Sequence, residues 1–418
     1  MGIPRAWPAV LLLLPAVLLA PRTTAGAAEL QLGPRRELTH PGKGHEVHAS
    51  APALAVTSDG TPLVTWATEE GQDKHVYVAR MGDGSAKPVR VNPATLGVES
   101  LHHSPLLAVG PGGEIYLSWS SDRPKPDGVL FASDLRLSRS LDGGKTWEGH
   151  LRVNEDRPTS HSFEGMAVTP EGTVVMAWID SREGPERAAT WVARVLDRGM
   201  RPAPSIKLDG DTCVCCRVGV RGGPGDTVAV LWRKVFPGDI RDMVLGLSRD
   251  GGKSFETPAR VADDGWKITA CPHRGGQVAM DGNGKVYAAW YTEGKQGVPR
   301  MLLATSADGR RFGAPLRINS STATIPDQIR LAVNAAGQVV VVWEDATAVR
   351  RRILLRASLD GGRTLGPVQT LSRAVKAYSP DVAMTPTGDF VVAWHEEQFP
   401  SLKTVVQTLR VSPLRVSR

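Results

Sequence analysis

Cysteine and histidine side chains that could bind a soft metal ion gather in two short segments of the sequence. Cys213, Cys215 and Cys216 lie within four consecutive positions, and Cys271 and His273 follow in a Cys-Pro-His segment. Thiolates and an imidazole suit Cu(I), or Zn(II) in a closed tetrahedron. The spacing matches no zinc-finger pattern and no haem attachment site. We therefore expect a copper or zinc site where the fold brings the two segments together.

The same cysteines could instead form disulfide bonds. The sequence has 4 cysteines, and an even number of cysteines in a chain that works outside the cytoplasm usually pairs. A bridge from Cys271 to Cys213 or to Cys215 would join the two segments. One such bridge would not explain three cysteines so close together, so the metal site and the disulfide both stay open at this point.

The N-terminal segment predicts the compartment. Arg5 precedes an apolar run at 9–20, and the small residues Ala-Gly-Ala at 25–27 form a cleavage site. This pattern is typical of a secretory signal peptide, and the run is too short to remain as a membrane span. We expect residues 1–27 to be removed, so that the mature chain is secreted or periplasmic with no membrane span.

Composition narrows the class of protein further. The chain has 50 Lys+Arg against 43 Asp+Glu and no long basic run, which argues against a nucleic-acid partner. Its 44 Gly and 31 Pro are spread evenly along the sequence. So many chain-reversing residues indicate many short strands and exclude a fold of long helices.

An internal repeat predicts the elements that would position the cysteines and histidine. Each repeat has a short apolar strand, a Gly-containing turn and a second strand ending in tryptophan, as at 330–343, and two more strands follow. Four antiparallel strands per unit, repeated seven times, predict an all-β, seven-bladed β-propeller as a single domain over residues 28–418. Six blades, with one repeat outside the ring, are the alternative. We expect a spare outer strand at 29–38 to complete the last blade and close the ring. The repeated tryptophans are Trp66, Trp119, Trp178, Trp232, Trp290, Trp343 and Trp394.

Polar side chains concentrate at one end of the predicted strands. In a four-stranded meander, the entry to strand one and the loop between strands two and three lie on one face. Residues at these places are rich in His, Cys, Arg, Asp, Glu and Tyr, whereas the opposite turns are plain glycine hairpins. Because strand one lines the propeller axis, we expect these groups to converge on a central mouth that binds a ligand.

A turn motif links the third and fourth strands of several repeats. Its Asp would accept hydrogen bonds from the turn's own amides, and its Gly would supply positive φ. The motif is similar to the Asp-box, or bacterial neuraminidase repeat, of the sialidase superfamily, and the chain resembles that superfamily over most of its mature length. In that superfamily the Asp-box is structural and lies away from the active site. The copies are Ser-x-Asp-Gly-Gly at 140–147, 248–255 and 358–365, with a shortened one at 306–312.

The resemblance implies a glycan-processing site at the mouth. Sialidases bind the sugar carboxylate with three arginines, whose forked donors suit it. They use a tyrosine nucleophile activated by a glutamate, and an aspartate acts as general acid/base. The matching positions are Arg217, Arg274 and Arg330 for the carboxylate, Tyr378 as nucleophile, and Glu164 or Asp381 as its partner.

The chain also departs from the sialidase pattern. The Arg-Ile-Pro motif is absent, the nearest match being Thr-Ile-Pro at 324–326, and seven blades exceed the six usual in sialidases. The segment 232–273 resembles a group of exported bacterial sialidase-like proteins that carry the same cysteine cluster. The leading prediction is an exported sialidase-like propeller that binds or hydrolyses a glycan, with a sialoside as candidate substrate. The rivals are a copper- or zinc-binding exported protein and a non-catalytic interaction propeller.

Overall fold

The computed structural model describes Gly2 and residues 28–40, 49–70, 73–82, 86–98, 100–101, 103–123, 132–184 and 188–413. Apart from Gly2, the predicted signal peptide at residues 1–27 lies outside the described residues and stays a prediction. Strands dominate, and the exceptions are a short helix, α1 (Leu196–Gly199), and a 3-10 turn, η2 (Gly294–Gln296). Within the described ranges, no helix is long and apolar enough to cross a membrane.

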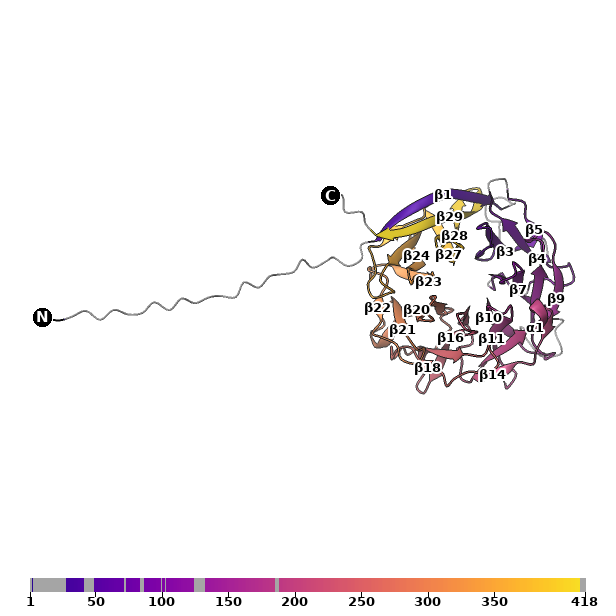
Figure 1. The fold of residues 1–418 in the computed structure, drawn as a ribbon, viewed down its shortest axis with the longest axis horizontal. Helices are drawn as coiled ribbons and strands as arrows, with labels where there is room; N and C mark the ends of the chain where they lie inside the picture. The colour runs from indigo at the N-terminus through magenta and orange to yellow at the C-terminus, as the bar shows by residue number, and fades with distance from the viewer. Residues whose placement is uncertain are drawn as a thin grey trace.

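Antiparallel units form a ring of seven blades around a central axis (Figure 1), and a single parallel bridge between Arg351 and Lys376 joins the last two blades into one sheet. The first three blades are built as follows. Blade 1 contains β2 (Ala53–Val56), β3 (Pro62–Glu70), β4 (Asp73–Arg80) and β5 (Val89–Arg90). Blade 2 contains β6 (Leu106–Val109), β7 (Ile115–Asp122), β8 (Ser133–Ser140) and β9 (Glu148–Arg152). Blade 3 contains β10 (His161–Val168), β11 (Val174–Asp180), β12 (Ala189–Val195) and two short outer strands, β13 (Arg201–Pro202) and β14 (Ile206–Asp209).

The remaining four blades follow in chain order. Blade 4 contains β15 (Gly219–Gly222), β16 (Val228–Phe236), β17 (Ile240–Ser248) and β18 (Ala259–Arg260). Blade 5 contains β19 (Gln277–Met280), β20 (Val286–Thr292), β21 (Arg300–Ser306) and β22 (Leu316–Arg317). Blade 6 contains β23 (Ile325–Val333), β24 (Val339–Ala346), β25 (Arg351–Ser358) and β26 (Gln369–Thr370). Blade 7 contains β27 (Lys376–Met384), β28 (Phe390–Gln398), β29 (Ser401–Pro413) and β1 (Ala28–Thr39).

The first strand of the described chain closes the ring. β1 pairs antiparallel with β29, from Ala28 opposite Pro413 to Thr39 opposite Lys403, and the two strands run side by side at the outer edge in Figure 1. Without β1, β29 would present an unpaired edge to solvent. The prediction that the N-terminal strand completes the last blade is confirmed.

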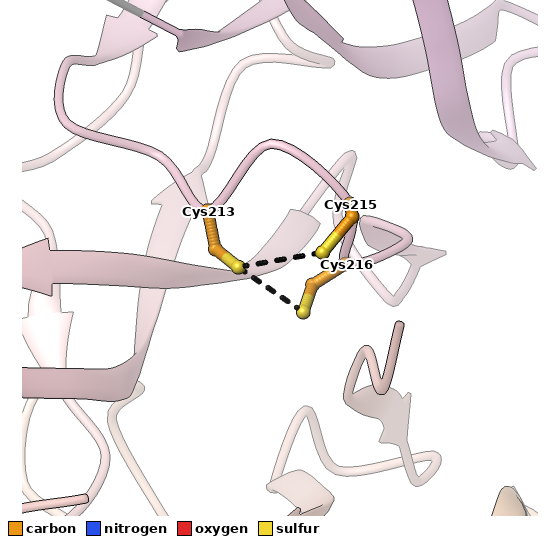
Figure 2. A group of neighbouring side chains, drawn as sticks. All are labelled: Cys213, Cys215 and Cys216. Atoms are coloured by element: carbon orange, nitrogen blue, oxygen red, sulfur yellow. Dashed lines mark hydrogen bonds between the residues drawn. The ribbon is translucent and has the colours of Figure 1, made fainter. Parts of the chain in front are cut away.

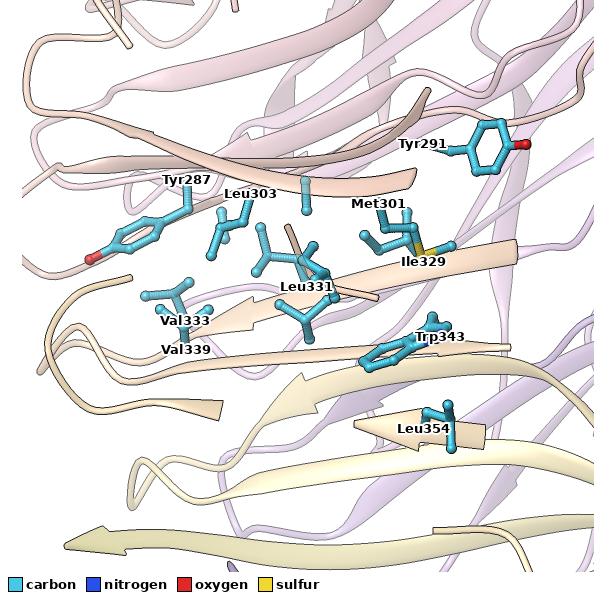
Figure 3. Close-up of a cluster of buried hydrophobic side chains, with 14 of the residues drawn as sticks. Tyr287, Tyr291, Met301, Leu303, Ile329, Leu331, Val333, Val339, Trp343 and Leu354 are labelled. Atoms are coloured by element: carbon cyan, nitrogen blue, oxygen red, sulfur yellow. The ribbon is translucent and has the colours of Figure 1, made fainter. Parts of the chain in front are cut away.

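Apolar packing between neighbouring blades forms the core. All seven repeated tryptophans lie on the second strands of their blades and are at most 2% exposed. Figure 3 shows one such layer, in which Leu303 and Met301 of blade 5 face Leu331 and Trp343 of blade 6. Burial of apolar area of this kind is the main favourable term in folding. The repeated tryptophans therefore mark the packing between blades.

The predicted Asp-box turns form as expected. The Asp142 carboxylate accepts hydrogen bonds from the amides of Lys145 and Thr146, both at 2.9 Å, and from the Thr146 hydroxyl at 2.7 Å. These bonds lower the pKa of Asp142. Gly144 adopts φ 91°, which favours glycine. These turns stabilise blade ends and lie outside the axial cavity described below.

The innermost strands approach each other closely at the axis, and glycine is required there. A Cβ added at Gly275 would overlap the carbonyl oxygen of Arg217 in the adjacent blade and come within 3.0 Å of its backbone nitrogen. Gly82, by contrast, has no positive φ, and no heavy atom of the described residues lies within 4 Å of a Cβ added there.

We therefore expect Gly275→Ala to lower the free energy of unfolding by about 1–3 kcal/mol, the usual cost of overpacking. Gly82→Ala is the matched control and should change it by less than about 0.5 kcal/mol. Urea unfolding followed by tryptophan fluorescence measures both. Equal effects of the two substitutions would contradict the proposed steric requirement at the axis.

Candidate functional site

A cavity of about 1590 Å³ opens at one end of the axis. Residues of all seven blades or of their entry loops form its wall, for example Ser50, His103, Phe163, Gln277 and Ser379. Of the residues that the sequence singled out, six line the cavity: Arg217, Arg274, Arg330, Tyr378, Cys215 and His273. Five do not: Cys213, Cys216, Cys271, Glu164 and Asp381.

Cationic side chains dominate the cavity wall. Its acidic residues are Asp122, Asp327 and Glu397. Its cationic residues are Lys74, Arg123, Arg217, Arg274, Arg330, Arg351 and Lys376. A cleft lined by an excess of one sign of charge concentrates ligands of the opposite sign. The cavity is therefore suited to an anionic ligand.

Four residues near the beginnings of inner strands have a left-handed backbone conformation, and their side chains line the cavity. Phe163, His273, Gln328 and Ser379 have φ values of 55°, 51°, 48° and 55°. In blades 3, 6 and 7 the register of the inner strand shifts at this point. Bulges of this kind redirect side chains beside functional sites. Phe, Gln and Ser do not favour a left-handed backbone, so only His273 is of a residue type enriched in that conformation.

Arg274 and its neighbours form a charged cluster on one side of the cavity. Its Nε and Nη2 donate to the two carboxylate oxygens of Asp327, at 3.2 and 3.3 Å. Burial opposes the charge, but Asp327 raises the pKa of Arg274. The guanidinium carbon lies 4.2 Å from the ring centre of Tyr291, whose hydroxyl donates to Glu293 at 2.7 Å. Arg274 is thus held rigidly and keeps further N–H donors for a ligand.

Arg330 pairs with Asp381, which the sequence proposed as a catalytic group. The Arg330 Nε lies 3.4 Å from Oδ1 of Asp381, and Oδ2 accepts the amide of Leu54 at 2.8 Å. Burial lowers the pKa of Arg330 and raises the pKa of Asp381. Asp381 therefore ties blades 6, 7 and 1 together and lies outside the cavity wall.

Arg217 and Glu164 also have structural contacts. Arg217 donates from Nη1 to the backbone oxygen of Glu164 at 3.0 Å and from Nη2 to that of Ser104 at 3.2 Å. The Glu164 side chain is fully buried, and neither of its carboxylate oxygens has a hydrogen-bond partner among the described residues. The bulge between Ser162 and Gly165 places this side chain in the interior.

The acidic neighbour of Tyr378 is Glu397. Burial, and after it the charge and hydrogen bonding of the Glu397 carboxylate, raise the pKa of Tyr378 to about 12. Both side chains line the cavity. Neither Glu164 nor Asp381 bonds to Tyr378, so the predicted partners are corrected to Glu397. The signal for it was its position three residues after Trp394, in the loop that the sequence placed at the mouth.

Three of the predicted metal ligands come together, and two do not. The sulfur of Cys213 lies 3.9 Å from that of Cys215 and 3.4 Å from that of Cys216 (Figure 2). Cys271 is exposed and lies outside this group. His273 is also outside it, and its ring lies 5.9 Å from that of Phe163.

The predicted disulfides do not form in this structure. All four cysteines have free thiols. The two segments meet at the cavity, where Cys215 and His273 both form part of the wall, but Cys271 and His273 do not join the thiol group. The ligand set is therefore corrected to Cys213, Cys215 and Cys216.

Comparison with known proteins identifies the fold and no family. No protein-family model matches the sequence, and no curated protein matches it. An ulvan lyase of polysaccharide lyase family PL25 matches with a TM-score of 0.58 and 13% identity, over 88% of this chain and 95% of that one. An α-L-arabinanase from Penicillium chrysogenum matches with a TM-score of 0.51 and 14% identity, over 90% and 98%.

A third similar structure is an α-L-arabinofuranosidase from Fusarium graminearum, with a TM-score of 0.52 and 14% identity, over 90% of this chain and 97% of that one. The chain is similar in structure to β-propeller enzymes that act on glycans. Identities this low show the fold alone, so membership of the sialidase superfamily stays a prediction.

His395 packs against the Tyr378 ring, 5.7 Å between ring centres, and is fully buried. Its Nε2 lies 2.9 Å from the backbone oxygen of Ser50, and burial lowers its pKa from 6.5 to about 4. The folded state therefore resists protonation more than the unfolded chain, so its stability is complete above pH 6.5 and falls as pH drops towards 4. We expect the titration of His395 alone to lower the free energy of unfolding by about 2 kcal/mol between pH 6.5 and pH 5.

Urea unfolding at both pH values tests this expectation. His395→Gln should be less stable at pH 7 but should lose less stability on acidification than the unsubstituted protein. An identical loss in both proteins would show that His395 does not carry this pH dependence.

Proposed function

We propose that this protein binds an acidic oligosaccharide in its axial cavity. The observation that carries the proposal is the cation-rich wall: among the described residues that line about 1590 Å³, seven are Lys or Arg and three are acidic. The volume exceeds the ~300–1,000 Å³ of ordinary small-molecule pockets, which favours several sugar units over a single one.

The arginines would hold the acidic groups of the glycan. Arg274 is oriented by Asp327 and by the Tyr291 ring, so little side-chain entropy remains to be lost on binding. Its unused donors can pair with a carboxylate in forked geometry. Because Asp327 already neutralises part of the charge of Arg274, the position of the free Arg274 donors, as well as their charge, selects the ligand.

The structural neighbours support a glycan as ligand class. The similar propellers include a polysaccharide lyase, an arabinanase bound to arabinobiose, and an arabinofuranosidase bound to an iminosugar inhibitor. Their low identity to this chain transfers no substrate. The signal-peptide pattern at residues 1–27 supports an encounter with the glycan outside the cytoplasm.

For the bond-cleaving step, with a sialoside as the substrate class, we propose Tyr378 as the nucleophile and Glu397 as the base that accepts its proton. The tyrosine oxygen bonds to the anomeric carbon as the glycosidic bond breaks, the leaving alcohol takes the proton back from Glu397, and water then hydrolyses the tyrosyl–sugar bond. A neutral tyrosine suits an anionic substrate better than a carboxylate, which would be repelled. Because the pKa of Tyr378 is raised to about 12, the hydroxyl is protonated at neutral pH. Proton transfer to Glu397 must therefore accompany the attack.

Binding is tested with an acidic and a neutral oligosaccharide of equal length, measured by isothermal titration calorimetry. We expect binding of the acidic one, weakened by added salt. Arg274→Gln should weaken it by about tenfold or more, as loss of a hydrogen bond to a charged group does. The control, Lys253→Gln, removes the same charge from an exposed position outside the cavity and should bind normally. Equal affinity for the neutral sugar would contradict the proposal.

Cleavage is tested separately with a fluorogenic sialoside. Tyr378→Phe should abolish turnover while acidic oligosaccharide binding persists. Tyr116→Phe is the control, because the buried Tyr116 hydroxyl has no hydrogen-bond partner in the described part of the chain and lies outside the cavity wall. Turnover that survives Tyr378→Phe would exclude the nucleophile, and absence of turnover in the unsubstituted protein would leave binding as the function.

A further inference from the structure

Three buried thiols converge in one turn at the entry to blade 4. Cys213, Cys215 and Cys216 are 1%, 4% and 0% exposed, and their sulfur atoms lie within 4.8 Å of one another. Figure 2 shows the three side chains projecting from the turn towards a common point. The sulfur separations of 3.4 and 3.9 Å exceed the ~2.0 Å of a disulfide bond. An odd number of thiols also cannot pair completely among themselves.

The turn is anchored at both ends, so the thiols are held in place before any ligand arrives. The amide of Cys213 donates to the backbone oxygen of Arg233 in β16 at 2.8 Å. After the turn, the amide of Val218 donates to the backbone oxygen of Phe163 in blade 3 at 2.9 Å. A site fixed between two blades binds a ligand with less ordering cost than a free loop.

Two guanidinium groups supply positive charge beside the sulfurs. Arg241 Nη1 donates to the sulfur of Cys213 at 3.3 Å. Arg233 is fully buried and donates only to backbone oxygens, those of Arg241, Arg274 and Tyr291, with no carboxylate at ion-pair distance among the described residues. Guanidinium donors of this kind stabilise negative charge on a sulfur that binds a metal ion.

From this geometry we propose that Cys213, Cys215 and Cys216 bind one Cu(I) ion in a trigonal, three-sulfur site. Soft thiolate ligands select Cu(I). Three thiolates around one monovalent ion leave a twofold negative charge, which Arg233 and Arg241 balance in the interior.

Zinc fits this set less well. Structural Zn(II) sites are closed by four ligands, and no fourth His, Cys, Asp or Glu joins the three thiols among the described residues. The cluster also has a path for the ion, because Cys215 forms part of the cavity wall next to Phe163. The inference does not rest on the glycan proposal, since it uses different side chains.

The test is an anaerobic titration of the reduced protein with Cu(I), in competition with a chromophoric Cu(I) chelator. We expect one Cu(I) per chain, with copper–thiolate absorption in the ultraviolet and three sulfur neighbours by X-ray absorption spectroscopy. Cys216→Ser should lower the affinity by more than the ~10–100-fold that loss of a supporting residue costs a metal site. Cys215→Ser, next to the cavity, is the second variant should Cys216→Ser fail to fold.

Cys271→Ser is the matched control, since it removes an exposed thiol outside the cluster, and it should bind Cu(I) as the unsubstituted protein does. Arg241→Gln should weaken binding by roughly tenfold while leaving all thiols titratable. The proposal is wrong if reduced protein with three titratable buried thiols binds no Cu(I). An equal loss in Cys271→Ser, or displacement of Cu(I) by stoichiometric Zn(II), would also overturn it.

Discussion

Close contact of the inner strands around one axis is the constraint on which the rest of the structure depends. At Gly275 the backbone of blade 5 comes so near to Arg217 of the preceding blade that no Cβ fits. Gly165 and Gly222 come similarly close to the backbone of the neighbouring blade, so the inner strands of blades 3, 4 and 5 pack tightly at the axis. The pairing of β1 with β29 then holds the ring closed, so that loops distant in the sequence remain at fixed separations.

Much of this architecture could be predicted because it depends on local sequence patterns. The tryptophans recur once per blade, the Asp-box turns bond to their own amides, and an unpaired outer edge calls for a further strand. Each of these features depends on residues near one another in the sequence or on a general rule about sheet edges. Trp343 and β1 therefore lie where the sequence placed them.

The side-chain pairs of the site could not be predicted in the same way. Phe163 and Ser379 adopt left-handed backbone conformations that their residue types do not favour, and only the surrounding blades impose them. The bulge that contains Phe163 places the Glu164 side chain in the interior. Glu397, the partner of Tyr378, comes from the next strand of the same blade. Its position after Trp394 placed it at the mouth, but the sequence alone does not decide which of several nearby acids faces Tyr378.

The two proposed sites have one structural support in common. Arg233 places its positive charge beside the thiols and, through the same guanidinium group, donates to the backbone oxygens of Arg274 and Tyr291 at 3.0 and 2.8 Å. Those two residues form one wall of the anion-binding cavity. A buried cation is costly unless its donors are satisfied, and Arg233 meets this requirement through these backbone oxygens. Arg233 therefore joins the segment beside the thiol cluster to the backbone of the cavity wall.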